Sequence, residues 1–162
     1  MAVSKASPSG EVMQQQRRDF LALLSLMAAS GLLPAGLARA EDWNNAAFAA
    51  KNIDELLRTL GAGTPKLSAE VVLMAPEIAE NGALVPIEIE SKLPDTRSIA
   101  ILIEKNPNVL AASFTIPNGT LPWLQTRVKM AETCNVHVLV NASGQFYYIT
   151  KEVKVTIGGC GG

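Results

Sequence analysis

The sequence of 162 residues is poor in the residue types that build metal, redox and nucleic-acid sites. Two cysteines and one histidine are too few for a zinc or iron–sulfur site with several protein ligands. The 14 basic and 15 acidic residues give a net charge of -1, without any run of like charges. The chain therefore lacks the basic face that neutralises nucleic-acid phosphates. With 48% hydrophobic residues it can still bury one real core, so we expect a single globular domain.

The sequence also lacks the residue arrangements of a self-contained catalyst. It contains no nucleophile–base–orienter set, phosphate loop or haem-binding motif. We therefore expect a non-catalytic protein, without catalytic residues, a cofactor or a metal.

Residues 1–40 have the pattern of an export leader. A polar stretch ends at Arg17-Arg18, residues 20–37 are apolar and uncharged, and Ala38-Arg39-Ala40 is a small-x-small cleavage site. Paired arginines before Phe-Leu resemble the twin-arginine signal of bacteria, and a general secretory signal with two incidental arginines is the alternative. Either signal predicts a mature periplasmic chain that begins at Glu41. No later apolar stretch is long enough to span a bilayer.

The mature chain opens with a helical pattern and continues with strand patterns. Residues 43–60 carry an apolar stripe at three- and four-residue steps, which favours one helix packed over the core, the alternative being a helix that binds a partner. From residue 70 onward, about seven short β-like runs alternate with Asn-Gly and proline turns, the last two at residues 146–149 and 153–157. Residues 99–103 are apolar enough to be buried on both faces. The prediction is mainly β: an immunoglobulin-like antiparallel β-sandwich with an N-terminal helix over residues 41–157.

The last five residues, 158–162, read Gly-Gly-Cys-Gly-Gly. Because Gly158, Gly159, Gly161 and Gly162 have no side chain to pack, we expect a flexible carrier arm that does not dock on the core. Such an arm reaches at most roughly 17 Å. The Cys160 thiolate can attack sulfur, form S–S bonds and later leave, so Cys160 is the predicted covalent attachment site. No basic residue in the arm activates this thiol, so a partner must do so.

The C-terminal stretch 154–162, the residues 75–82 (Ala-Pro-Glu-Ile-Ala-Glu-Asn-Gly) and the leader resemble the SoxY family, the carrier subunits of the bacterial sulfur-oxidising (Sox) system. The resemblance implies that Cys160 carries thiosulfate and related sulfur anions. It also implies a heterodimer with a SoxZ-like subunit. Transient partners would be a sulfur-loading c-type cytochrome (SoxAX), a sulfate-releasing hydrolase (SoxB) and, in some organisms, a sulfane dehydrogenase (SoxCD).

Alternatives remain for both cysteines and for the function. Cys134 could pair with Cys160 or bind a metal with His137, but we expect it to be buried as a small hydrophobe, which free cysteine often is. Residues 134 and 137 face opposite sides of a continuous strand, which argues against a shared metal. An exported thiol–disulfide exchange protein is a rival function, although no Cys-x-x-Cys pair is present. A Gly-Gly thiocarboxylate carrier is another, but its ATP-dependent activation conflicts with export.

Overall fold

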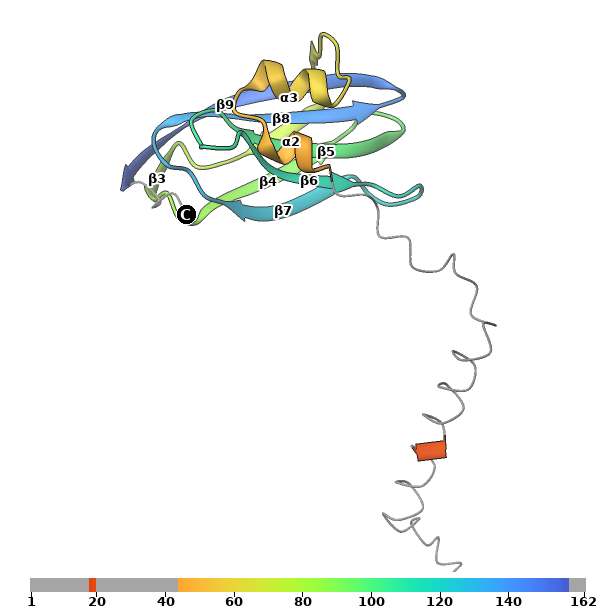
Figure 1. The fold of residues 1–162 in the computed structure, drawn as a ribbon, viewed down its shortest axis with the longest axis horizontal. Coiled ribbons are helices and arrows are strands. Elements are labelled where there is room, and N and C mark those ends of the chain that lie inside the picture. The colour runs from red at the N-terminus through yellow and green to blue at the C-terminus, as the bar shows by residue number, and fades with distance from the viewer. Residues whose placement is uncertain (1–17, 20–43, 158–162) are drawn as a thin grey trace, which may run out of the picture. The chain divides into compact units, whose positions relative to one another are not determined.

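The computed structural model describes residues 18–19 and 44–157 (Figure 1). The chain divides into two units, Met1–Trp43 and Asn44–Gly162. In the first unit only Arg18 and Asp19 are described, and both are helical. The predicted cleavage site and the predicted carrier arm at 158–162 lie outside the described residues. No helix within the described ranges is long and apolar enough to cross a membrane.

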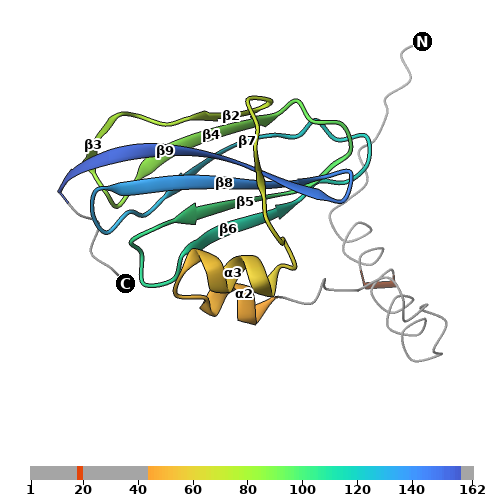
Figure 2. The same cartoon turned by 90° about the horizontal axis from the view of Figure 1, so that it is seen from above.

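Two β-sheets face each other in the second unit, and two short helices lie outside the larger sheet (Figure 2). The larger sheet has the order β1-β9-β8-β5-β6, with β3 also paired to β9. Its strands are β1 (Lys66–Leu67), β3 (Ile78–Asn81), β5 (Thr96–Ile103), β6 (Leu110–Thr115), β8 (Cys134–Ala142) and β9 (Gln145–Ile157). The smaller sheet has the order β2-β4-β7, formed by β2 (Val71–Met74), β4 (Val85–Ser91) and β7 (Trp123–Val128).

The larger sheet separates two hydrophobic cores. Between the sheets lies the main core, to which β5 contributes Ile99, Ile101 and Ile103. Beneath the helices lies a second core, to which the same strand contributes Ala100 and Leu102 from its other face. Burial of β5 on both faces confirms the prediction for residues 99–103. The mainly β sandwich is confirmed as well.

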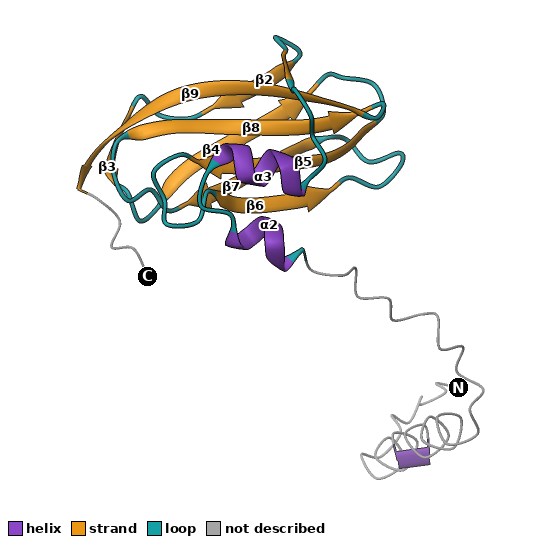
Figure 3. Cartoon of the chain, turned by 45° about the horizontal axis from the view of Figure 1, so that its top comes forward, coloured by secondary structure: helices purple, strands orange, loops and turns teal. Residues whose placement is uncertain are grey.

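The single helix predicted over residues 43–60 is wrong. The structure has two helices, α2 (Asn45–Ala49) and α3 (Ile53–Thr59), shown in Figure 3. The break comes at Asn52, whose backbone is extended (φ -145°, ψ 163°) and whose side chain accepts a hydrogen bond from the Glu55 amide at 2.8 Å. Asparagine caps a helix start better than it continues a helix, so the chain restarts there. The helices do pack over the core as expected, with Leu56 fully buried.

The strand pattern also differs from the prediction in two respects. The runs predicted at 146–149 and 153–157 are one strand of 13 residues, β9, paired with β8 from Gln145 to Val153. The sandwich is not purely antiparallel, because β1 and β3 each pair with β9 in parallel. Both parallel strands are short, at two and four residues, and join β9 through long-range pairing.

Candidate functional site

The candidate site is built on the last residues of β9, because this strand ends where the predicted carrier arm begins. Strand β8 starts at Cys134, which pairs with Val153, so β9 continues beyond the end of its long partner. We call residues 154–157 the arm base. Here β3 replaces β8 as the pairing partner, with Ile78 opposite Lys154 and Asn81 opposite Ile157.

Each residue of the arm base has a hydrogen bond to the sandwich. On the β3 side, the Lys154 amide donates to the Glu77 carbonyl at 2.9 Å, and the Thr156 hydroxyl donates to the Glu80 carbonyl at 3.0 Å. On the other side, the Val155 amide donates to Thr133 Oγ1 at 2.9 Å.

The last carbonyl of the strand is held in the same way. Ile157 O accepts a hydrogen bond from the Gly82 amide at 2.8 Å, and Gly82 O accepts one from the amide of fully buried Met130 at 2.7 Å. The chain therefore leaves the sandwich from a fixed point. Cys160 is three residues after Ile157, so its Cα stays within roughly 11 Å of the Ile157 Cα.

The predicted attachment residue Cys160 and the arm glycines Gly158, Gly159, Gly161 and Gly162 lie outside the described residues. Their roles remain predictions. The structure adds anchors that the sequence did not indicate, above all Thr133 and Gly82. Gly82 closes the stretch 75–82 that resembles the family, but the local sequence does not show that Gly82 or Thr133 bonds to β9, because both reach it from other parts of the chain.

The other cysteine, Cys134, is a free thiol buried in the main core at 5% exposure. Burial raises the pKa of this thiol, because desolvation penalises the thiolate. A buried, protonated thiol is a poor nucleophile, so Cys134 is not a candidate attachment site. This confirms the prediction that it is buried as a small hydrophobe.

His137 faces the helices, on the opposite side of β8 from Cys134, as the strand spacing predicted. Its Nδ1 lies 2.7 Å from Thr150 Oγ1, while its Nε2 is buried without a partner in the described part of the chain. Desolvation lowers the pKa of the imidazole. Among residues 18–19 and 44–157, no three potential metal ligands come together.

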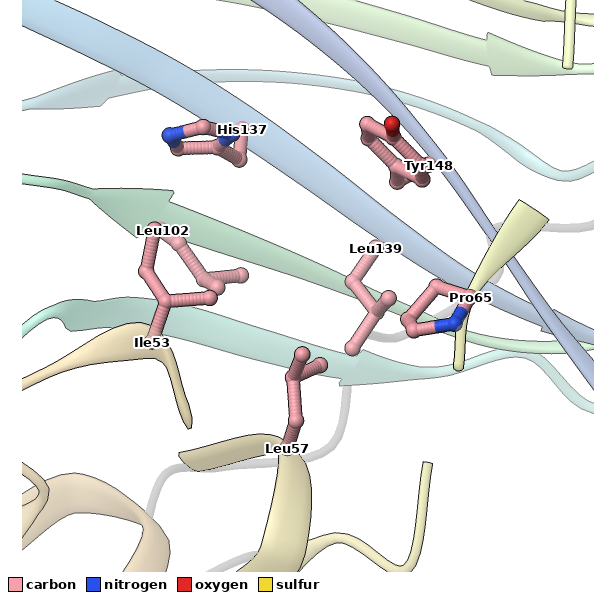
Figure 4. Close-up of a pocket in the computed structure, with 7 residues that line it drawn as sticks. All are labelled: Ile53, Leu57, Pro65, Leu102, His137, Leu139 and Tyr148. Atoms are coloured by element: carbon pink, nitrogen blue, oxygen red, sulfur yellow. The ribbon is translucent and has the colours of Figure 1, made fainter. Parts of the chain in front are cut away.

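A cavity of about 300 Å³ lies between α3 and the larger sheet (Figure 4). Ile53 and Leu57 from α3 face His137 and Tyr148 across it. Thr150, which bonds His137, is seven residues from Ile157 along β9, or roughly 23 Å at the rise of a β-strand. The reach of Cys160 from Ile157 is about half of that. The cavity is therefore not a resting place for the arm's thiol.

A comparison with protein families matched the part of the chain that forms most of the sandwich. A protein-family model described as "Sulfur oxidation protein SoxY" matches residues 57–160, so its last matched residue is Cys160. The chain belongs to the SoxY family. Among solved structures, it is similar to the sulfur carrier protein SoxY from Chlorobium limicola f thiosulfatophilum, with 36% identity and a TM-score of 0.54. That match covers 62% of this chain and 93% of the Chlorobium chain.

Other similarities are weaker. A superoxide reductase (neelaredoxin) from Ignicoccus hospitalis is 16% identical with a TM-score of 0.47, covering 52% of this chain and 79% of its own. A single-residue variant of the same reductase is 14% identical with the same TM-score, covering 60% and 86%. At these values the likeness has no bearing on what a SoxY-family chain does. No curated protein matches the chain significantly.

Proposed function

We propose that this protein is the periplasmic carrier of sulfur intermediates in thiosulfate oxidation, holding them covalently on Cys160. Membership of the SoxY family supports a sulfur-carrier role in sulfur oxidation. The arm base supports the more specific proposal that the intermediates are bound to Cys160. β9 is tied on both sides up to its last carbonyl, three residues before Cys160, whereas the other cysteine is enclosed by the core.

The chemistry of loading follows from the thiolate. Cys160-S⁻ and thiosulfate form Cys160-S-S-SO₃⁻, and two electrons leave. A c-type cytochrome of the SoxAX kind is the proposed oxidant. Hydrolysis of the terminal S–S bond by a SoxB-like enzyme then consumes water and releases sulfate and two protons, leaving Cys160-S-S⁻. A sulfane dehydrogenase of the SoxCD kind would oxidise the remaining sulfur.

The protein itself supplies no catalyst in this scheme. Its contribution is to hold the reacting sulfur on a short tether, within about 11 Å of a fixed point, so that several enzymes can reach it in turn. The buried, protonated Cys134 keeps the chemistry on one thiol. The rival thiol–disulfide exchange role would require a second reactive cysteine near the first, and Cys134 lies in the core.

Substitution of each cysteine in turn by serine tests the proposal. Cys160→Ser should abolish loading by thiosulfate and the cytochrome, measured as the mass of the intact protein, because a hydroxyl forms no stable bond to sulfane sulfur. Cys134→Ser should still load. Its free energy of unfolding should fall by about 1–3 kcal/mol, because a polar hydroxyl replaces the thiol in the main core. A sulfur adduct at normal occupancy in Cys160→Ser would show that the wrong thiol has been chosen.

We also propose that the mature chain forms a heterodimer with a SoxZ-like subunit. The outer face of the smaller sheet presents Trp123 and Met74 at 46% and 45% exposure, as an interface would. Co-expressed subunits should sediment as one heterodimer. Two independent monomers would contradict the proposal.

A further inference from the structure

The cavity of about 300 Å³ between α3 and the larger sheet has the wall composition of a small-molecule site. Aliphatic side chains from α3, β5 and β8 form most of its wall. His137 on β8 and Tyr148 on β9 are the two lining residues whose side chains carry polar atoms. Ligand pockets in proteins have this character, with a mostly apolar wall and a few polar groups that fix the orientation of the ligand.

His137 holds a polar atom that lacks a partner. Its Nδ1 lies 2.7 Å from Thr150 Oγ1, whereas its Nε2 is buried and has no hydrogen-bond partner among the described residues. The imidazole lies at the same end of the cavity as Leu102 and Ile53 (Figure 4). Buried polar atoms in folded proteins are nearly always bonded, because an unbonded one costs free energy. Nε2 is therefore a binding group that the described part of the fold leaves unused.

The charge of the wall and the state of the imidazole decide which ligand chemistry fits. Desolvation lowers the pKa of His137, so the ring is neutral at neutral pH. The lining contains no lysine, arginine or carboxylate, so neither an anion such as thiosulfate nor a cation would find a counter-charge there.

The hydrogen bond of Nδ1 narrows the polar group of the ligand. The Thr150 hydroxyl either donates to Nδ1 or accepts from it, so Nε2 carries the proton in one tautomer of His137 and a lone pair in the other. A ligand hydroxyl pairs with both tautomers, because it can donate or accept. A hydroxyl is thus the simplest group that satisfies Nε2.

The volume of the cavity sets the size of the ligand. An apolar protein cavity of about 150 Å³ holds a single benzene ring. A volume near 300 Å³ therefore accommodates two fused rings. The aliphatic wall favours a hydrocarbon skeleton, because each further polar group would lose its hydration without gaining a partner.

We propose that this cavity binds a neutral two-ring apolar molecule whose single hydroxyl group forms a hydrogen bond with His137 Nε2. The site is separate from the sulfur chemistry and does not rest on the proposed carrier function. The ligand would contact α3 and strands β5, β8 and β9 at once, so it would hold the helix against the sheet. Its binding should therefore raise the Tm of the protein.

A matched pair of probes tests the ligand class. 2-Naphthol and naphthalene share the same two rings and differ in one hydroxyl group. Both should bind the purified full chain, 2-naphthol about two- to tenfold more tightly, as expected for one hydrogen bond. The chain has one histidine, so proton–nitrogen NMR reports on its ring without ambiguity. The Nε2 resonance should shift with 2-naphthol and much less with naphthalene. Equal affinities, an unmoved Nε2 resonance, or no binding of either probe would each overturn the proposal.

Two tryptophan variants of α3 and its end test where the probes bind. Leu57→Trp enlarges a side chain of the cavity wall and should abolish binding, because the indole takes up the space. The matched control is Leu60→Trp, the same change at a half-buried position outside the lining, which should bind both probes as the wild type does. Unchanged binding in Leu57→Trp would place the probes elsewhere and overturn the site.

His137→Phe tests the polar contact separately and keeps the question answerable if Leu57→Trp fails to fold. This variant should still bind naphthalene but lose the preference for 2-naphthol, because the ring nitrogen is gone. Circular dichroism checks that the variant is folded. A preference for 2-naphthol that survives in His137→Phe would overturn the assignment of Nε2 as the binding group.

Discussion

At the scale of residues, the two cysteines differ in the property that decides reactivity. Cys134 is enclosed by the main core, and desolvation raises its pKa, so it stays a thiol at neutral pH. Cys160 stands among glycines, where we expect an ordinary thiol with a small thiolate fraction. If the chain is exported as we propose, it would hold two cysteines in an oxidising compartment and present only Cys160 as a reactive thiol.

His137 provides a prediction at the same scale. Its folded-state pKa is lowered by desolvation, against a smaller opposing effect of Glu104. The unfolded chain, with a histidine pKa of about 6.5, then binds the proton more readily than the folded chain. The neutral imidazole carries no penalty in the folded chain above a pH of about 6.5. As the pH falls below that value, proton binding favours the unfolded chain and the folded chain loses stability. The free energy of unfolding should therefore drop between pH 7.5 and pH 5.5.

Urea unfolding of His137→Phe at the same two pH values checks the cause. The chain has one histidine, so the substitution removes all histidine titration. The drop should become smaller, while Thr150→Val, which removes only the partner of Nδ1, should retain it. An equal drop in wild type and His137→Phe would show that carboxylates alone are responsible.

At the scale of elements, β9 connects the sandwich to the predicted function. Its middle residues are polar, which is why the sequence suggested two strands. The strand is nevertheless continuous, because Thr150, Lys151 and Glu152 each pair with a residue of β8. Pairing of this kind depends on a distant partner, so local patterns do not reveal it.

The limits of the sequence prediction have the same origin throughout. The apolar run of β5 was readable, because that pattern depends only on neighbouring residues. Features that depend on distant residues were not, including the parallel strand β3 and the hydrogen bonds of Thr133 and Gly82 to the arm base. The helix break at Asn52 is the exception, since its capping preference was available in the sequence.

The arm base yields a prediction at the scale of the element. Thr133→Val removes the hydroxyl that accepts from the Val155 amide. That amide should then exchange faster with solvent by about five- to tenfold, as expected for loss of about 1 kcal/mol. Amide exchange followed by NMR measures this directly. Thr120→Val, in the exposed loop before β7, is the control and should leave Val155 unchanged. Equal protection of Val155 in both variants would mean that β3 alone holds the arm base.

At the scale of the whole molecule, the fold is compatible with the export route that residues 1–40 predict. Residues 44–157 form a sandwich whose strands pair across long stretches of sequence, so the carrier body exists only once the chain has folded. The twin-arginine pathway exports folded proteins. A chain exported this way would reach the periplasm with Cys134 already enclosed, and only Cys160 would remain open to oxidation or loading.

Export therefore provides the prediction for the molecule as a whole. Replacing Arg17 and Arg18 by lysine should block the twin-arginine route and leave the precursor in the cytoplasm with residues 1–40 attached. Fractionation of cells and the N-terminal sequence of the protein measure this, and the wild type should be periplasmic and begin at Glu41. Ile101→Asp, which places a charge in the main core, is a second arm of the test. With an intact leader but an unfolded body it should also stay in the cytoplasm, because this pathway rejects unfolded cargo. Normal processing of the double-lysine variant would identify a general secretory signal, and the chain would then fold only after export.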